Sequence, residues 1–121
     1  MKSHRAFRCR DREFLYRLQE VVDQEYQDRD FGLARLAAAM KISERQVQRK
    51  LKSLVACTPS EYLRNHRLQK ALPYLREGEP IGETASKVGF ASQSYFTSCF
   101  RAKYGCTPTE YQTSQGEAGS A

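Results

Sequence analysis

The sequence of 121 residues predicts an all-α protein that is built on an internal repeat. The phrase CTPSEYL at residues 57–63 returns 49 residues later as CTPTEYQ at residues 106–112. Apolar residues recur at the spacing of one helix face, and no segment alternates between apolar and polar residues as a half-buried strand does. Together these observations predict two copies of helix, short turn and helix, each followed by a capped third helix.

The chain ahead of the first copy predicts one amphipathic helix. Asp11 is its expected N-cap, because a carboxylate can accept hydrogen bonds from the free amides of the first turn. Residues 11–30 carry three arginines against seven acidic residues, so this helix is expected to be acidic and to face solvent. Its apolar face consists of Phe14, Leu15, Leu18, Val21, Val22 and Tyr26.

The first copy, over about 31–56, predicts a helix, a short turn and a second helix. Ser43 is expected to cap the second helix, with Gln46 as its reciprocal partner in a capping box. Each helix has one apolar stripe at helical spacing, as expected when one face is buried. The stripes are Leu33, Leu36, Ala37 and Met40 in the first helix and Val47, Leu51 and Leu54 in the second.

The repeated phrase predicts the start of a third helix in each copy. Its threonine is a good N-cap, its proline suits the first helical position, and its glutamate can reach back to complete a capping box. The helix after the first phrase, about 59–76, would link the copies, and Pro73 is expected to kink it or to end it near Leu72. The residues of the phrase are Thr58, Pro59 and Glu61, then Thr107, Pro108 and Glu110.

The second copy, over about 81–105, aligns with the first. At an offset of 49, SERQVQRKLKSLVACTPSEY (43–62) lies over SQSYFTSCFRAKYGCTPTEY (92–111), so that Phe96 matches Val47 and Phe100 matches Leu51. Upstream the offset is 48, and the extra residue falls in the turn between two helices. The tail over 113–121 has nothing to bury and is expected to be disordered.

The positive charge is concentrated on the first copy. The chain has a net charge of +6 and a pI near 9.3, which favours an acidic polymer as partner. Residues 41–70 hold eight Lys/Arg against two acids, whereas residues 81–112 hold three against two. Opposite the apolar stripe of 43–54, one ridge carries Arg45, Gln48, Arg49 and Lys52.

That ridge has the chemistry of a groove reader. Arginine pairs with guanine and glutamine with adenine from a major groove that admits one helix. A solvated face is the alternative, since charge runs usually have no other role. The second occurrence of a short capped helix after a tight turn favours nucleic acid.

No pattern indicates an enzyme, a metal site or a membrane protein. The chain has no Gly-rich phosphate loop, no paired histidines and no recognisable nucleophile setting, so we expect no catalytic residue and no cofactor. No apolar run approaches the ~20 residues that span a bilayer, and the basic start has no apolar signal region. The four cysteines form no CxxC pair and are expected to be reduced thiols in the cytoplasm, with a redox or metal sensor at Cys99 and Cys106 as an alternative.

Three segments resemble the DNA-binding domain of the AraC/XylS family of bacterial transcription regulators. They are LARLAAAMKISERQVQRKLK, ACTPSEYLRNHRL and IGETASKVGFASQSYFTSCFRAKYGCTPTEYQ, and the GF, SYF and G.TP.EY pattern of the last is the most diagnostic. The resemblance covers about 11–112. It implies about seven helices in two helix-turn-helix subdomains joined by a long linker helix. Recognition helices at about 44–55 and 93–104 would each enter a major groove of double-stranded DNA.

The resemblance also implies site residues and a role. Expected base readers are Arg45, Gln48, Arg49, Gln93, Ser94, Tyr95, Thr97 and Ser98, and expected phosphate contacts are Lys41, Ser43, Lys52, Ser92 and Arg101. The expected role is control of transcription, most often activation, at the nucleoid in the bacterial cytoplasm, with RNA polymerase as a candidate partner. Two departures from the family pattern, Thr84 in place of Ile or Val and Pro73 in the linker helix, leave the packing of the second unit open.

Family members usually attach this domain to a ligand-binding, dimerising, receiver or sensor domain. The run over 3–37 resembles a linker entering the output domain of a two-component response regulator, so we expect a piece of a longer regulator. Residues 1–10 would be a linker remnant or a basic arm on DNA. The alternatives are a stand-alone monomeric regulator and a helical protein-interaction module. A small-molecule effector is expected to bind elsewhere, and the DNA site is expected to be asymmetric, with two unlike blocks.

Overall fold

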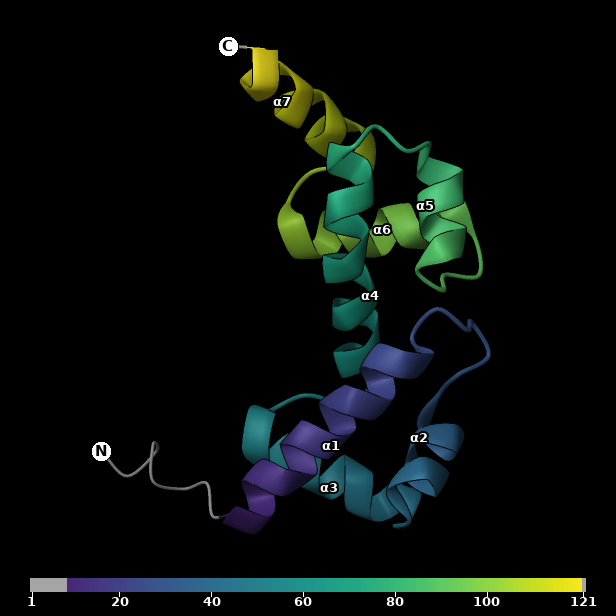
Figure 1. Cartoon of the computed structure of the whole chain (residues 1–121), viewed down its shortest axis with the longest axis vertical. Helices are drawn as coiled ribbons and strands as arrows, with labels where there is room; N and C mark the ends of the chain where they lie inside the picture. Colours follow the sequence, from purple (N-terminus) through teal and green to yellow (C-terminus); the bar gives the residue numbers. More distant parts are fainter. Residues whose placement is uncertain (1–8, 121) are drawn as a thin grey trace, which may run out of the picture. The chain divides into compact units, whose positions relative to one another are not determined.

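The computed structural model describes residues 9–120, and the side chains of residues 10–115. Seven helices and no strand make up this part of the chain (Figure 1). The expected all-α class and the expected number of helices are confirmed. The helices are α1 Cys9–Glu25, α2 Leu33–Met40, α3 Glu44–Val55, α4 Pro59–Arg76, α5 Ile81–Lys87, α6 Gln93–Tyr104 and α7 Pro108–Ser120.

The chain divides into two compact units. Unit 1 comprises α1 and the segment Phe31–Leu63. That segment contains α2, α3 and the first residues of α4. Unit 2 comprises Tyr26–Asp30 together with the chain from Arg64 onward. Each unit contains one helix-turn-helix pair, α2–α3 in the first and α5–α6 in the second, and α4 runs from one unit into the other.

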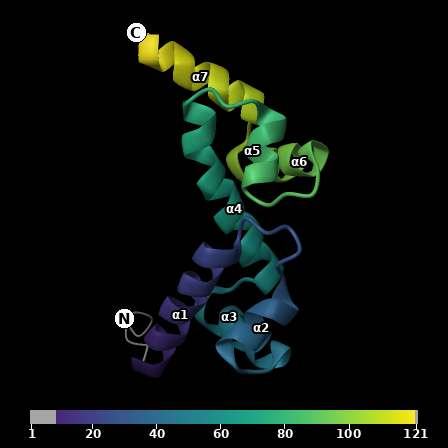
Figure 2. The same ribbon diagram turned by 45° about the vertical axis from the view of Figure 1, so that its right-hand side comes forward.

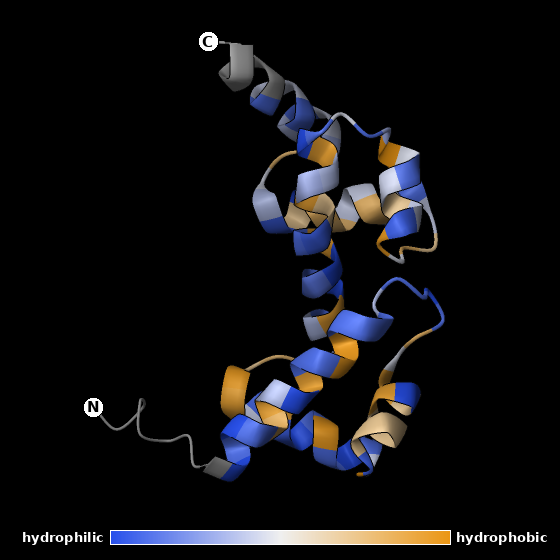
Figure 3. Cartoon of the chain, in the orientation of Figure 1, coloured by the Kyte–Doolittle hydropathy of each residue, from blue (hydrophilic) through white to orange (hydrophobic). Residues whose placement is uncertain are grey.

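Unit 1 has a core of aliphatic side chains and two phenylalanine rings, Phe14 and Phe31. Helix α2 packs on α1 and on α3, as both ribbon views show (Figure 2). The hydropathy colouring shows apolar residues on one side of α1 and polar residues on the other (Figure 3). Its other buried members include Leu18, Val22, Leu36, Val47 and Leu51.

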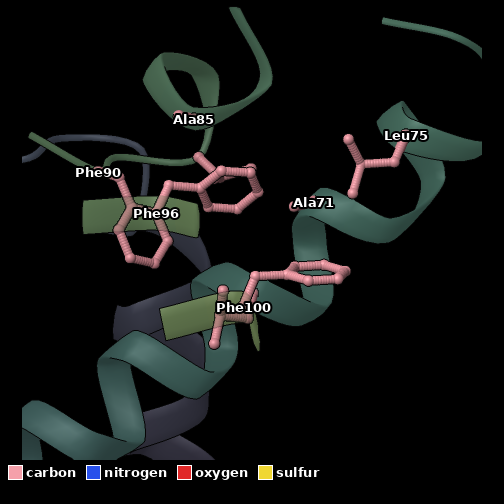
Figure 4. Close-up of a cluster of buried hydrophobic side chains, with 8 residues drawn as sticks. Ala71, Leu75, Ala85, Phe90, Phe96 and Phe100 are labelled. Carbon is pink, nitrogen blue, oxygen red and sulfur yellow. The ribbon is translucent and has the colours of Figure 1, made fainter. Parts of the chain in front are cut away.

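Unit 2 has an aromatic core. The Phe96 ring lies edge-on to Phe90 at 5.1 Å between centroids and to Phe100 at 5.8 Å. These rings pack against Ala71 and Leu75 of α4 and Ala85 of α5 (Figure 4). Helices α4, α5 and α6 of this unit therefore meet on phenylalanine side chains of α6 and of the turn before it.

The predicted capping boxes are present. Ser43 Oγ accepts from the amide of Gln46 at 3.1 Å, and Gln46 Oε1 accepts from the amide of Ser43 at 3.1 Å. The two copies of the repeated phrase make the same reciprocal pair at the starts of α4 and α7. The pairs are Thr58 with Glu61 and Thr107 with Glu110.

The cap proposed for the first helix is wrong. Asp11 lies inside the first turn of α1, which begins at Cys9, and its Oδ1 lies 3.5 Å from Lys50 Nζ. The acid serves an ion pair between α1 and α3, which a local reading of the sequence cannot show. Tyr26, counted in the apolar face of this helix, lies in the turn after it and belongs to unit 2.

Two expectations about helix ends also differ from the structure. Helix α4 continues through Pro73 to Arg76 and does not end near Leu72. Pro73 leaves the Gln69 carbonyl without its helical donor, and both residues are exposed, so water can satisfy that carbonyl. Residues 113–120, expected to be a disordered tail, continue α7 from its capped start, and residue 121 lies outside the described residues.

The expected linker or basic arm over 1–10 lies almost wholly outside the described residues, with only residues 9 and 10 placed, in α1. Across residues 9–120, no helix has both the length and the apolar character needed to cross a bilayer.

Candidate nucleic-acid interface

Helix α3 presents a cationic ridge to solvent. Val47 and Leu51 are fully buried in unit 1, so residues at i, i+3, i+4 and i+7 on the opposite face are exposed. These are Arg45, Gln48, Arg49 and Lys52, the base readers and phosphate contact predicted on this helix. With Ser53 they line a shallow hollow of about 490 Å³.

The ridge carries uncompensated charge. Within the described part of the chain, no hydrogen bond or ion pair holds any of its four side chains. Three cations and one amide therefore remain available to a partner, on a helix that is itself firmly packed. This is the arrangement that a groove reader needs, because rigid elements position side chains more closely than loops do.

The turn before α3 holds its N-terminus in place. Lys41, the left-handed C-cap of α2 with φ 61°, donates its amide to the Ala38 carbonyl at 3.1 Å. Ile42 donates its amide to the Ala37 carbonyl at 3.2 Å, and Ser43 then caps α3. Lys41 and Ser43 are both exposed, so the two expected phosphate contacts in this turn are accessible.

Helix α6 presents a different face. The positions that match the α3 ridge are Ser94, Thr97, Ser98 and Arg101. Thr97 is half-buried, and the other three are exposed. Ser92 Oγ accepts from the Tyr95 amide at 3.1 Å, but residue 95 is a tyrosine and cannot return the bond, so the capping box is half complete.

Two predicted readers of α6 are packed against unit 2. The Tyr95 ring is half exposed and lies 5.6 Å from the Phe90 ring between centroids. The Gln93 side chain lies over Gly82, where an added Cβ would come within 2.9 Å of Gln93 Oε1. These contacts restrict the positions of the Tyr95 and Gln93 side chains, whereas no such contact restricts the side chains of Arg45 and Arg49.

Two of the cations counted with the basic surface over 41–70, Arg67 and Lys50, instead make contacts within the fold. Arg67 donates from Nε to the Tyr26 carbonyl and from Nη2 to the Asp28 carbonyl, both at 2.8 Å, and its burial lowers its pKa. Lys50 lies 5.2 Å from the Phe14 ring centroid and beside Asp11. Gly89 lies beside the Arg67 contact, where an added Cβ would come within 2.7 Å of Arg67 Nε.

The redox or metal alternative gains no support from the described residues. Cys57, Cys99 and Cys106 are free thiols and half-buried, and burial raises the pKa of Cys57. In the described part of the chain, no three His, Cys, Asp or Glu side chains come together in a group that could hold a metal ion.

Comparison with known proteins shows which family has this arrangement of helices. A family model described as a helix-turn-helix domain matches residues 36–114. The curated regulator MtrA of Neisseria gonorrhoeae, an HTH-type transcriptional regulator, is 29% identical over 88% of this chain. The chain spans 35% of the length of that regulator, and between 8% and 38% of the length of the other curated relatives that we compared.

Two solved structures are similar to the chain. One is the C-terminal domain of the two-component response regulator yesN of Fusobacterium nucleatum, with a TM-score of 0.73, 27% identity, and 78% and 93% of the two chains covered. The other is the DNA-binding domain of the global transcriptional factor AdpA in complex with a target DNA. Its TM-score is 0.70 at 28% identity, with 81% and 91% covered. The matched family model runs from residue 36, within α2, through α3 and the whole second helix-turn-helix pair, and the chain belongs to the AraC-type helix-turn-helix family of transcriptional regulators.

Proposed function

We propose that this chain binds double-stranded DNA in a sequence-specific way and so regulates transcription, with activation as the expected direction. The observation that carries the proposal is the uncompensated cationic ridge on α3. This helix follows directly on a tight turn in which Lys41 caps the end of α2 and Ser43 caps the start of α3. The AdpA domain was solved with a target DNA, and this chain has the same fold. We expect α3 to lie in a major groove with this ridge toward the bases.

The side chains of α3 and its turn have separate roles in this proposal. Arg45 and Arg49 pair with guanine through two parallel N–H groups, and Gln48 pairs with adenine. Lys52 and Lys41 contact phosphates, since a single ammonium neutralises charge but matches no base edge closely. The Ser43 hydroxyl accepts from the Gln46 amide, and its proton, which lies toward Gln46 Oε1 at an O···O distance of 3.5 Å, can turn to a phosphate instead.

Helix α6 is proposed as a weaker reader in a second major groove. Ser94, Thr97 and Ser98 bear hydroxyls, which accept several partners and therefore discriminate poorly between bases. Tyr95 offers its exposed ring edge, and Gln93 offers an amide near the helix start. Arg101 and Ser92 are proposed phosphate contacts.

The expected symmetry of the DNA site follows from the fact that one chain presents two unlike recognition helices. No two-fold axis is imposed on the duplex, so the site should be asymmetric. Successive major grooves on one side of a duplex lie about 10 bp apart, which sets the expected separation of two unlike blocks. Base preference should be strong in the block under α3 and degenerate in the block under α6.

The chain is proposed to be the output part of a longer regulator. It spans at most 38% of the length of the curated relatives that we compared, and one similar structure is the C-terminal domain of a response regulator. A stand-alone monomeric regulator is the alternative. In either case we propose that it acts on the bacterial chromosome in the cytoplasm, with RNA polymerase as a candidate partner.

Selection of bound duplexes from a random library tests the proposal. Enrichment of one asymmetric site with two blocks at about 10 bp separation is the expected result. Lys52→Ala should weaken binding to specific and random duplexes alike and reduce the salt slope by about one unit. Enrichment of no sequence, with a polyanion competitor removing all binding, would favour a protein-interaction module with an acidic partner.

A further inference from the structure

Unit 1 contains a second hollow, none of whose lining residues belongs to the α3 ridge. Its volume is about 440 Å³, within the ~300–1,000 Å³ usual for small-ligand sites. It is formed by α1, the turn between α2 and α3, and Lys50 of α3. Phe14, Met40 and Ile42 supply apolar side chains to its lining, so the apolar part of a ligand could be buried against them.

The same hollow is lined by cations. Arg10, Arg17, Lys41 and Lys50 all line it, against Glu13 as the one acid among its described lining residues. Arg10 and Lys41 have no ion-pair partner within the described residues. The lining is therefore net positive beside an apolar surface.

Two of these cations are fixed in place. Arg17 donates from Nη2 to the Ala39 carbonyl at 3.2 Å, which anchors one edge of its guanidinium and leaves further N–H groups for a ligand. Lys50 Nζ lies 3.5 Å from Asp11 Oδ1 and 5.2 Å from the centroid of the Phe14 ring. Asp11 offsets part of the charge of Lys50, so Arg10, Arg17 and Lys41 provide most of the attraction for an anion.

The combination selects a class of ligand. A phosphate of a passing duplex would use the cations and leave the apolar residues uncovered. A neutral hydrophobe would cover those residues and leave the cations without a partner. A small molecule with an apolar body and one acidic group uses both.

We propose that this hollow binds a small amphiphilic carboxylate, either an aliphatic chain or an aromatic ring that carries one acidic group. The expectation from the sequence was that this segment binds no effector, because family members usually carry a separate ligand-binding domain. Lys41 lines the hollow and is also a proposed phosphate contact. On the proposed function, a bound carboxylate would neutralise Lys41 and weaken binding to all duplexes alike, by linkage.

The first test uses the free chain and needs no DNA. Titration with 2-naphthoate, followed by amide chemical shifts in NMR, should give saturable changes that are largest at residues 10–17, 39–42 and 50. Two matched probes separate the contributions: 2-naphthalenemethanol keeps the ring without the charge, and acetate keeps the charge without the ring. We expect the alcohol to bind at least fivefold more weakly and acetate to cause no localised shift at equal concentration.

Variants then locate the site. Arg17→Gln should weaken naphthoate binding at least fivefold, whereas Arg12→Gln should leave it within twofold. Arg12 is exposed on the same helix and does not line the hollow, so it is a matched control. Met40→Gln, which removes part of the apolar lining, should also weaken binding and keeps the test decisive if Arg17→Gln unfolds the chain.

Several results would overturn the proposal. These are shift changes centred on residues 45–53, equal naphthoate affinity in Arg17→Gln and Arg12→Gln, or equal binding of naphthoate and the alcohol. If naphthoate does not bind while Arg17→Gln weakens all duplexes alike, the cations contact DNA phosphate instead. Naphthoate binding to a chain that binds no duplex would support the hollow and contradict only the proposed function.

Discussion

Helices α3 and α6 are the same local structure with different outer surfaces. Each has 12 residues, starts at a serine N-cap and ends at a left-handed residue. The matched positions Val47 and Phe96 are both fully buried, as are Leu51 and Phe100. The exposed ridge changes from Arg, Gln, Arg and Lys to Ser, Thr, Ser and Arg. The repeat has kept the apolar character of the positions that fold the helix and changed the chemistry of the positions that a partner would contact.

The cores behind the two helices also differ. The buried face of α3 is aliphatic, whereas that of α6 is aromatic and stacks three phenylalanine rings edge to face. The phenylalanine rings of α6 are larger than the valine and leucine at the matched positions of α3, so each buries more area. Paired substitutions at matched positions of α3 and α6 therefore separate what each copy contributes to stability and to binding.

The largest effect is expected at the core pair. Phe96→Ala should lower the free energy of unfolding by about 3–5 kcal/mol, because it removes a fully buried ring and leaves a cavity beside two other rings. Val47→Ala removes less volume and should cost less. Urea unfolding followed by far-UV circular dichroism measures both. An equal loss from the two variants would contradict the view that the α6 core depends on its rings.

The next effect is on DNA. Arg49→Ala should weaken binding to the selected duplex by about 1–3 kcal/mol and relax base preference at one or two positions. The matched Ser98→Ala should cost less than about 1 kcal/mol, since a lost hydroxyl bond has a small net value. Fluorescence anisotropy at fixed salt compares them on one duplex. A larger loss from Ser98→Ala would refute the asymmetry between the two helices.

The caps should differ by a smaller amount. Ser43→Ala removes the bond from the Gln46 amide to Ser43 Oγ, whereas the amide of residue 43 can still donate to Gln46 Oε1, so it should destabilise the chain by about 1 kcal/mol. Ser92→Ala removes the bond from the Tyr95 amide and leaves no reciprocal bond, so it should cost more than Ser43→Ala. Amide hydrogen exchange in the first turns of α3 and α6 reports each end separately. Slower exchange at α6 than at α3 in these variants would show that the remaining glutamine bond adds no stability.

The smallest effect has the opposite sign. Thr84 is fully buried, and its Oγ1 has no hydrogen-bond partner, whereas the matched residue of the first copy is Leu36. Thr84→Val keeps the shape and removes a buried polar group, so it should stabilise the chain by about 1 kcal/mol. Urea unfolding measures the change. A loss of stability would mean that the hydroxyl has a partner that this structure does not show.

Local chemistry made much of this fold predictable. The capping boxes at Ser43, Thr58 and Thr107 depend on residues three apart, and the apolar stripes on residues three and four apart, so both can be read from the sequence alone. The bounds of α3 and α6 were implied by the resemblance to the AraC/XylS family, and the capping box at Ser43 independently marks the start of α3. The ridge on α3 was predictable for the same reason, because it is the face opposite a stripe.

Contacts between distant segments were not predictable. Asp11 looks like a cap and forms an ion pair with Lys50, 39 residues away. Arg67 looks like one more surface cation, but it holds the carbonyls of Tyr26 and Asp28. The second hollow depends on three elements that no motif connects. Such features need the packed structure, because no local spacing encodes which segments meet.

The segment Tyr26–Asp30 has a consequence for protein engineering. It belongs to unit 2, yet the chain on both sides of it belongs to unit 1. At Gly89 a Cβ would lie 2.2 Å from the Tyr26 carbonyl oxygen and 2.7 Å from Arg67 Nε, so only glycine fits beside this segment. A chimera that grafts a foreign second unit after residue 63 would therefore separate residues 26–30 from the Gly89 and Arg67 that they contact. Grafts should carry residues 26–30 with the new unit and exchange two stretches of sequence instead of one.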